Sequence, residues 1–182
     1  MSDGRRFHVV TGGPGAGKTS LIEALRGQGR AVVGEAGRGV IREQAAIEGP
    51  ALPWRDPAAF AEAMLVWDLR SYREACEGVG AVYFDRGLPD IAGYLSLCGL
   101  PLPSHLERAI ARLRYAPEVF IAPPWPEIYR QDAERRQDAA EAERTYRAMV
   151  ETYRRFGYRL IELPRQPVEA RCRFLLERTA AA

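Results

Sequence analysis

The stretch GGPGAGKT, residues 12–19, decides the fold of this chain. It fits the pattern G-x-x-x-x-G-K-[ST], in which glycines let backbone N–H groups approach phosphates, the lysine reaches the terminal phosphates and the Ser or Thr hydroxyl binds Mg²⁺. We therefore predict a nucleotide site for ATP with Mg²⁺, formed by Gly12, Gly13, Pro14, Gly15, Ala16, Gly17, Lys18, Thr19 and Ser20.

Lys18 is the only lysine in the chain, and every other basic residue apart from the two histidines is arginine. Arginine does not easily replace a lysine in this loop, because the ammonium is a compact point charge and the guanidinium is a wide planar fork. The single lysine in an arginine-rich chain is therefore predicted to have a catalytic role as well as a nucleotide-binding one.

The residues on either side of the loop fit a strand and a helix. Phe7–Val10 form a short apolar run, and Ser20–Arg26 carry an apolar helical periodicity that ends at Gly27 and Gly29. The motif requires this order of strand, glycine loop and helix. The positive end of the helix dipole then adds to the attraction for phosphate. The alternative interpretation is a glycine-rich turn without a ligand.

Length and composition indicate a single domain over residues 1–182. The chain is long enough to bury a substantial core, and its 47% apolar and 27% charged content is ordinary for a globular protein. The net charge of +2, with arginines spread along the chain, argues against nucleic acid or a membrane as partner. The sequence leaves the oligomeric state open.

The three cysteines favour a reducing compartment. Cys76, Cys98 and Cys172 are far apart, odd in number and without a C-x-x-C pair, so they predict free thiols and not a disulfide frame or a metal site. We find no signal peptide and no apolar run long enough for a membrane span. A cytoplasmic location is the expectation.

Strand and helix patterns alternate along the rest of the chain. Further strands are expected at residues 31–33, 81–84, 119–121 and 158–161, each followed by a helical pattern. This alternation predicts an α/β fold, with a parallel sheet covered by helices on both faces and ligands at the carboxyl ends of the strands. A longer helix is expected to start at Asp56 and Pro57.

Charged residues stand directly after the second and third predicted strands. Asp85 is predicted to bind Mg²⁺ or act as a base, the alternative being a helix N-cap. Glu35 is a candidate general base on an acceptor hydroxyl, or else a salt-bridge partner of Arg38 or Arg42. Arg86 is predicted to hold an anion or the acceptor.

A third cluster follows the fourth predicted strand, at approximately residues 124–140. The prolines at its start direct the chain away from the sheet, and three arginines follow within seven residues. Arginines on a lid can neutralise charge on a transferred phosphoryl group, so we predict catalytic roles for Arg130, Arg135 and Arg136. The alternative is a solvated helix face, because acidic residues alternate with these arginines.

An acceptor pocket would need polar and aromatic side chains near these strand ends. Candidate residues are Arg38, Trp54, Trp67, Tyr72 and Tyr94, of which we predict Arg38 and Trp54 to bind substrate together with Glu35 and Arg86. Aromatic residues at helical spacing also fit an ordinary core. Residues 163–168, after the last strand, are placed beside the adenine base by analogy with related folds.

The chain resembles the small P-loop kinases of the nucleoside and nucleotide kinase type. More narrowly, it is similar to compact bacterial proteins described as predicted ATPases or kinases, which share GGPGxGKT (12–19), EAxRxVI (35–41), FDRG (84–87) and PPWPEIYRxDxER (123–135). The resemblance implies a P-loop NTPase three-layer sandwich, with a five-stranded parallel sheet in the order 2-3-1-4-5 and an arginine-bearing lid. It also assigns the base to Glu35 and the phosphate- or acceptor-holding pair to Asp85 and Arg86.

Departures from other P-loop classes narrow the function. The third strand ends Asp85-Arg86, unlike the Asp-Glu of mechanical AAA ATPases, and the chain has no room for their additional helical domain. The chain contains no Asn, so the guanine-recognition signature is missing, and we interpret Asp90-Ile91-Ala92-Gly93 as a chance match to a GTPase switch motif. We predict a kinase acting on a small-molecule acceptor. The alternative is a nucleotide-binding switch or slow ATPase that acts through a protein partner.

Overall fold

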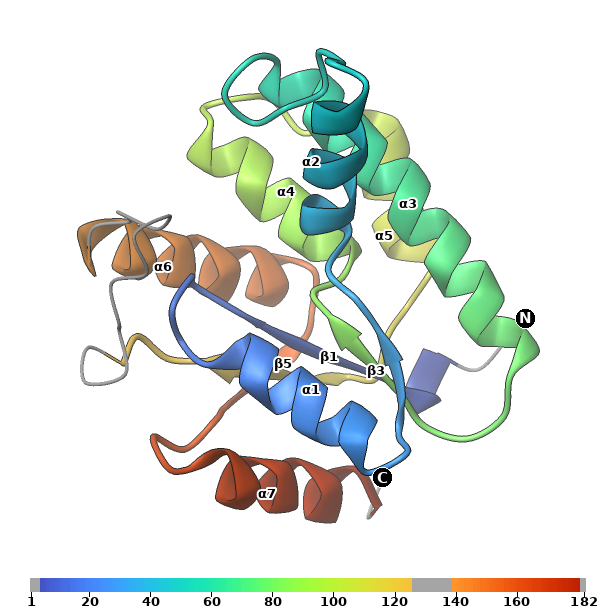
Figure 1. Ribbon diagram of the computed structural model, residues 1–182, viewed down its shortest axis with the longest axis vertical. Coiled ribbons are helices and arrows are strands. Elements are labelled where there is room, and N and C mark those ends of the chain that lie inside the picture. The colour runs from blue at the N-terminus through green and yellow to red at the C-terminus, as the bar shows by residue number, and fades with distance from the viewer. Residues whose placement is uncertain (1–3, 126–138, 181–182) are drawn as a thin grey trace.

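The computed structural model describes residues 4–125 and 139–180, drawn in colour in Figure 1. Five strands form one sheet in the order β2-β3-β1-β4-β5, and all of the pairs are parallel. The order predicted from the resemblance is therefore confirmed. The strands are β1 (Phe7–Gly12), β2 (Ala31–Val33), β3 (Val82–Asp85), β4 (Glu118–Ala122) and β5 (Arg159–Glu162).

Helices cover both faces of the sheet, which gives the predicted three layers. In Figure 1, α1 and α7 lie together on one side, and α3, α4, α5 and α6 lie on the other, with α2 packed on α3. None of the described helices is long and apolar enough to span a membrane. The helices are η1 (Gly4–Arg6), α1 (Lys18–Gly27), α2 (Ala36–Ala46), α3 (Pro57–Glu77), α4 (Leu88–Leu97), α5 (Ser104–Arg112), α6 (Ala139–Arg155) and α7 (Val168–Ala180).

Side chains along β1 alternate between two cores. Phe7 and Val9 pack on the side of α3 and α4, whereas Val10 packs with Leu21 and Leu25 on the side of α1 and α7. Each of these residues is fully buried, and burying a side chain of this size contributes about 1.5–3 kcal/mol. The continuous apolar pattern of β1 thus reflects burial on both faces, as in other parallel sheets.

The predicted element boundaries agree with the structure to within a few residues. The helix expected at Asp56 and Pro57 is α3, whose N-cap Asp56 accepts a hydrogen bond from the amide of Ala59 at 2.9 Å. Proline suits the first position of a helix, because its missing N–H would have had no partner there. The strand and helix on either side of the glycine loop, β1 and α1, are also confirmed.

Candidate functional site

The glycine loop is held between β4 and α6 by close backbone contacts. Gly12 has a φ of +129°, and a Cβ at that position would lie 2.5 Å from the carbonyl oxygen of Ala122. A Cβ on Gly13 would lie 2.6 Å from the carbonyl oxygen of Ala142 in α6. Both positions therefore need glycine. The loop then enters α1 at Gly17 without a side-chain cap, so the first amides of the helix are available to an anion.

Lys18, the first residue of α1, is buried beneath the loop and donates a hydrogen bond to the carbonyl oxygen of Gly13. Burial, followed by repulsion from Arg86, lowers the pKa of Lys18 to about 7. Asp85 and Glu35 act in the opposite direction without offsetting these effects. An ammonium in such a site is stabilised by added negative charge, which the phosphates of a nucleotide would bring.

Arg171, a residue that our sequence analysis did not single out, fixes the other side of the loop. Its guanidinium donates to the carbonyl oxygens of Ala16 and Gly17 at 3.1 and 3.3 Å. Only 3% of Arg171 is exposed, and its Nε has no hydrogen-bond partner in the described part of the chain. By binding these carbonyls from behind, Arg171 leaves the amides of the loop free to face a phosphate. The signal in the sequence is an arginine beside Cys172 on the buried side of α7.

Glu35 lies between two arginines that come from different elements. Its Oε2 is 3.0 Å from Nε of Arg38, and its Oε1 is 3.1 Å from Nε of Arg86. Burial raises the pKa of Glu35, but Arg86, Lys18 and Arg38 together outweigh it and hold the pKa below its usual value. The side chain is therefore an ionised hydrogen-bond acceptor at neutral pH. The ion pair with Arg38 that the sequence raised as an alternative is formed.

Arg86 adopts an unusual backbone conformation that directs its side chain into this cluster. Its φ is +70°, and its amide donates to the carbonyl oxygen of Val10 at 2.9 Å. A left-handed conformation in a residue other than glycine costs on the order of 1 kcal/mol. Ion pairs with Glu35 and with Asp90, the latter at 3.1 Å, offset that cost.

Asp90 is a second residue that the sequence analysis did not assign to the site. Its two oxygens accept hydrogen bonds from the hydroxyls of Thr11 at 2.5 Å and Tyr153 at 2.6 Å, and from the amide of Gly87 at 2.9 Å. Together with the ion pair to Arg86, these contacts join β1, α4 and α6. The match to a GTPase switch motif is thus accounted for by a buried structural carboxylate at the start of α4.

Asp85 ends β3 and is also buried. Its Oδ1 has no hydrogen-bond partner among the described residues. Burial and the charge of Glu35 raise the pKa of Asp85, although Arg86 and Lys18 act against them. The N-cap of α4 is Gly87, so capping is not the role of Asp85.

A Mg²⁺ ion fits the oxygen atoms available here. Magnesium binds one or two protein oxygens and otherwise uses waters and substrate phosphates. The orphaned oxygen of Asp85 and the hydroxyl of Thr19 are suitable ligands from β3 and α1. Within the described ranges no group of three His, Cys, Asp or Glu side chains could hold a metal by itself. An ion at this site would therefore depend on the phosphates of a bound nucleotide.

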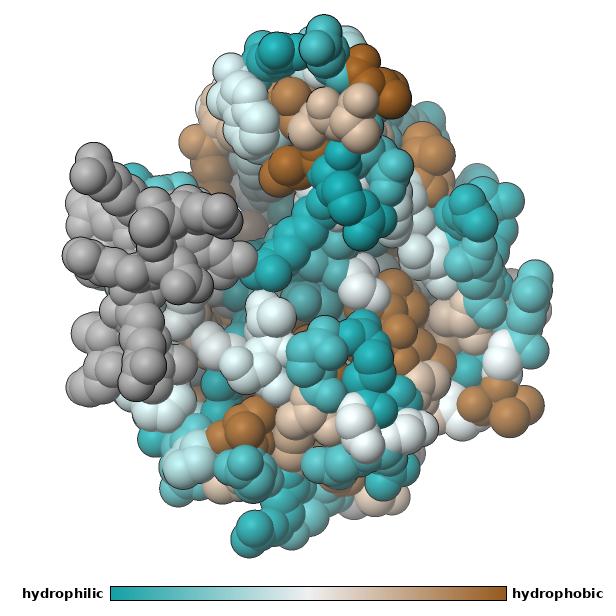
Figure 2. All heavy atoms as spheres, in the orientation of Figure 1, coloured by the Kyte–Doolittle hydropathy of each residue, from teal (hydrophilic) through white to brown (hydrophobic). Residues whose placement is uncertain are grey.

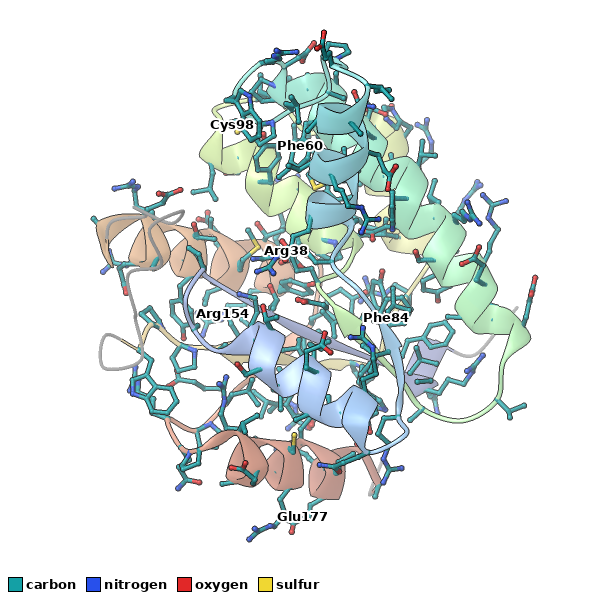
Figure 3. All side chains as sticks on the ribbon, viewed as in Figure 1. Arg38, Phe60, Phe84, Cys98, Arg154 and Glu177 are labelled. Atoms are coloured by element: carbon teal, nitrogen blue, oxygen red, sulfur yellow. The ribbon has the colours of Figure 1, made fainter. Side chains whose placement is uncertain are left out.

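A cavity of about 1240 Å³ joins the glycine loop to the space between the helices above it. Figure 2 shows this face of the molecule hollowed between α2 and α1, with hydrophilic side chains along the rim. Arg38 lies at this junction in Figure 3, where its Nη2 is 3.3 Å from the hydroxyl oxygen of Thr19. The two parts of the cavity thus meet at Arg38, Glu35 and Arg86.

The part of the cavity away from the loop is mainly apolar, and we call it the α2–α4 chamber. Phe60 from α3 projects into it between α2 and α4 (Figure 3). The charged residues Glu35, Asp68, Arg86 and Asp90 also line it. The other residues that define it are Ala36, Gly37, Ile41, Pro53, Met64, Ile91, Tyr94, Leu97 and Cys98.

The structure brings together some of the predicted acceptor residues and separates others. Arg38 and Tyr94 line the cavity, as do Gln166, Pro167 and Val168 from the segment after β5. Tyr72 is 3% exposed and its ring packs on the ring of Phe7, so it is part of the core. Trp67 packs partly buried against the same core. Trp54 is 67% exposed and lies outside the lining of the cavity.

The predicted lid falls mainly outside the described residues. Arg130, Arg135 and Arg136 all belong to that undescribed segment, and their roles remain predictions. The described flanks do reach the cavity: Trp125 lines it before the segment, and Arg144 lines it from α6 after the segment. Arg144 was not predicted, although it continues the arginine-rich pattern of the lid sequence.

The sheet order and the glycine loop define a small P-loop protein with the same fold as solved nucleoside kinase structures. The sequence also identifies the protein family. A profile described as AAA domain (AAA_28) matches residues 7–171, so the chain belongs to this AAA domain family. No curated protein sequence matches the chain.

Solved structures share the fold at low sequence identity. Deoxyadenosine kinase from M. mycoides, with dCMP and a flexible dCDP bound, aligns over 97% of this chain and 100% of its own, with a TM-score of 0.64 and 12% identity. The NadR protein in complex with NR aligns over 95% of this chain and 51% of its own, with a TM-score of 0.67 and 18% identity. At these identities, the likeness shows a common fold.

Proposed function

We propose that the protein is a kinase that transfers the γ-phosphoryl group of MgATP to a hydroxyl of a small acceptor, such as a nucleoside, a nucleotide or another alcohol. The observation that carries this proposal is the continuity of one cavity from the glycine loop to the α2–α4 chamber. Hydrolysis of ATP needs only space for water, whereas a chamber lined by Phe60, Met64 and Ile91 suits an organic acceptor. The solved kinase structures with the same fold support this interpretation.

The two carboxylates at the ends of β2 and β3 would have separate tasks. Asp85 and Thr19 would hold Mg²⁺, which when bound neutralises charge on the transferred phosphoryl group. Glu35 would accept a hydrogen bond from the acceptor hydroxyl and take its proton. The lowered pKa of Glu35 suits a loose transition state, in which the proton leaves late and orientation of the hydroxyl matters most.

Arginines would supply the remaining positive charge. Arg86 and Arg38 would hold Glu35 in place through their ion pairs with it. Arg38 would do this from its position between the chamber and the glycine loop. Arg144 would approach the phosphates from α6, and the predicted lid at residues 124–140 would contribute Arg130, Arg135 and Arg136. We further infer that residues 1–182 act as one domain, in the cytoplasm, where Cys76, Cys98 and Cys172 would stay reduced.

The proposal is tested by phosphorus NMR of the protein with MgATP, first alone and then with a pooled panel of nucleosides, monophosphates and other alcohols. We expect a new phosphoester or diphosphate resonance together with ADP, only when acceptors are present. ADP with an equal amount of free phosphate, unchanged by acceptors, would contradict it and favour the switch or slow ATPase.

A pair of variants assigns the base. Glu35→Gln keeps the size of the side chain but removes its charge, and we expect phosphoryl transfer to fall by at least about 100-fold with ATP binding retained. Glu43→Gln makes the same change on the exposed side of α2 and should leave transfer unchanged. Equal rates for both variants would remove Glu35 from the catalytic role.

A further inference from the structure

The charges around the α2–α4 chamber are balanced except at one residue. Glu35 is paired with Arg38 and Arg86, and Asp90 is paired with Arg86. Asp68, in the middle of α3, also lines the cavity. Across the described ranges it makes no hydrogen bond and no ion pair with another residue.

Asp68 is buried at a position where the fold would be served by an apolar side chain. Only 9% of the residue is exposed, and Met64 and Tyr72, one turn before and after it, are both buried. Because it lines the cavity, the little surface it retains opens toward the chamber. An unpaired buried carboxylate costs stability. The presence of this carboxylate beside a ligand-sized cavity therefore indicates a role in ligand binding.

The surroundings of Asp68 make it a receptor for positive charge. Burial, followed by repulsion from Asp90 and Glu35, raises the pKa of Asp68 to about 7. Tyr115 also lies near enough to interact with it electrostatically. Asp90 and Glu35 are carboxylates and Tyr115 is a neutral phenol, so none of the three brings a positive charge to Asp68 as an ammonium would. A ligand that brings a proton donor or a positive charge would supply the missing partner.

We propose that Asp68 determines acceptor specificity by binding an ammonium or amino group at the end of the acceptor remote from the reacting hydroxyl. This proposal rests on the proposed kinase function and specifies the acceptor: a hydroxyl compound with an apolar or aromatic body and a nitrogen donor. The body would lie against Phe60, Met64 and Ile91, with the hydroxyl at Glu35 and the donor at Asp68.

The test compares two matched pairs of probes that differ only in the donor. The first pair is meta-aminomethylbenzyl alcohol and meta-methylbenzyl alcohol, and the second is adenosine and purine riboside, which lacks the 6-amino group. Dissociation constants are measured by ligand-detected NMR titration with a non-hydrolysable ATP analogue on the P-loop, so that no turnover is needed. For wild-type protein we expect the amino member of each pair to bind about tenfold or more tightly than its partner.

Two variants separate Asp68 from general effects of charge. Asp68→Asn keeps the shape of the side chain, and we expect it to abolish the preference while the methyl compound binds within about twofold of wild type. Glu74→Gln makes the same change of charge on the exposed side of α3 and should keep the preference. Equal or absent binding of the amino members by wild-type protein, or a preference that survives in Asp68→Asn, would overturn the proposal.

The melting temperature separates ligand recognition from a purely structural role of Asp68, because a structural role predicts that the substitution lowers it. Asp68→Asn removes an unpaired buried charge, so it should melt at the same temperature as wild type or higher. A lower melting temperature with an unchanged ligand preference would assign Asp68 to the fold. If wild-type protein prefers the amino compounds but transfers no phosphoryl group, the kinase function alone is contradicted. If wild-type protein transfers phosphoryl groups but shows no such preference, this proposal alone is contradicted.

Discussion

The Nε atom of Arg86 lies 3.1 Å from Oε1 of Glu35, which links the residue after β3 to the residue at the N-cap position of α2. The two side chains are only 21% and 20% exposed. A second contact of the same guanidinium, to Asp90, continues the link into α4. The cluster therefore fixes the relative positions of three elements around the point where the glycine loop meets the α2–α4 chamber.

Replacement of Arg86 by lysine should weaken this cluster. The left-handed backbone is strained equally in both residues, so Arg86→Lys isolates the change of head group. A lysine ammonium cannot reach two carboxylates with the geometry of the guanidinium, and we expect a loss of about 2 kcal/mol in the free energy of unfolding. Urea denaturation measures this loss. Arg70→Lys, in an exposed pair on α3, serves as control and should show no change.

Removal of the lysine ammonium should abolish turnover without unfolding the protein. Lys18→Ala deletes a charge that the free protein holds at a cost, because burial disfavours it. We expect phosphoryl transfer or ATP hydrolysis to fall by at least about 100-fold, with the melting temperature equal to or above that of wild type. Retained activity would show that the loop uses another cation.

The lowered pKa of Lys18 predicts that nucleotide binding takes up a proton. With a pKa of about 7 in the free protein, the amine is mostly neutral at about pH 8.5, and phosphates will raise its pKa again. We expect uptake of close to one proton at that pH and none from Lys18 at about pH 6. Calorimetry of MgATP binding in buffers with different ionisation enthalpies measures the uptake. Lys18→Ala should lose it; identical uptake in both proteins would be inconsistent with this assignment.

The same shift predicts how Lys18 affects stability. Its pKa is about 7 in the fold and 10.5 for an unperturbed lysine, so the unfolded chain binds more protons between these values. The cost of Lys18 to stability is thus fully present below the folded pKa and is lost as pH rises toward the unfolded one. The difference in unfolding free energy between Lys18→Ala and wild type should therefore shrink across that window. A difference that is constant with pH would argue against the shifted pKa.

Asp85→Asn should raise the Mg²⁺ requirement of the reaction. The substitution removes the negative charge and one oxygen of the carboxylate that fits the ion, and we expect the Mg²⁺ concentration at half-maximal turnover to rise by at least about tenfold. Because the fold raises the pKa of Asp85, loss of its charge should not destabilise the protein. Activity titrated with MgCl₂, beside thermal unfolding, checks both points. An unchanged Mg²⁺ dependence would place the ion elsewhere.

The backbone of the site could largely be predicted from the sequence. The loop at residues 12–19 specifies its own conformation through glycines, and the apolar strands specify a parallel sheet. The charged residues after β2 and β3 then had to meet, since parallel strands end at the same edge of the sheet. The pairing of Arg86 with Glu35 is different, because it depends on a positive φ that no local pattern in the sequence requires.

The residues missed by sequence analysis are buried polar groups with apolar neighbours. Asp90 follows Arg86 by four residues, in an otherwise apolar segment, and that isolation was a signal of burial. Asp68 lies three residues after Leu65 and four before Tyr72, on the apolar face of α3, where a carboxylate is out of place. Arg171 stands beside Cys172 in the same manner. Each was a deviation from helical periodicity, which shows that a residue is buried but not what it contacts.

The contact between Gly13 and Ala142 restricts how this scaffold can be modified. Backbone meets backbone there, so α6 cannot slide or rotate without pressing on the glycine loop. Further along α6, Gly93 of α4 meets the flexible end of the Met149 side chain, so the limit there is weaker. Sequence variation that preserves the ATP site is therefore confined to the opposite wall of the cavity, in α2 and α3. A library aimed at new acceptors would best randomise Ile41, Phe60 and Met64 and leave α6 untouched.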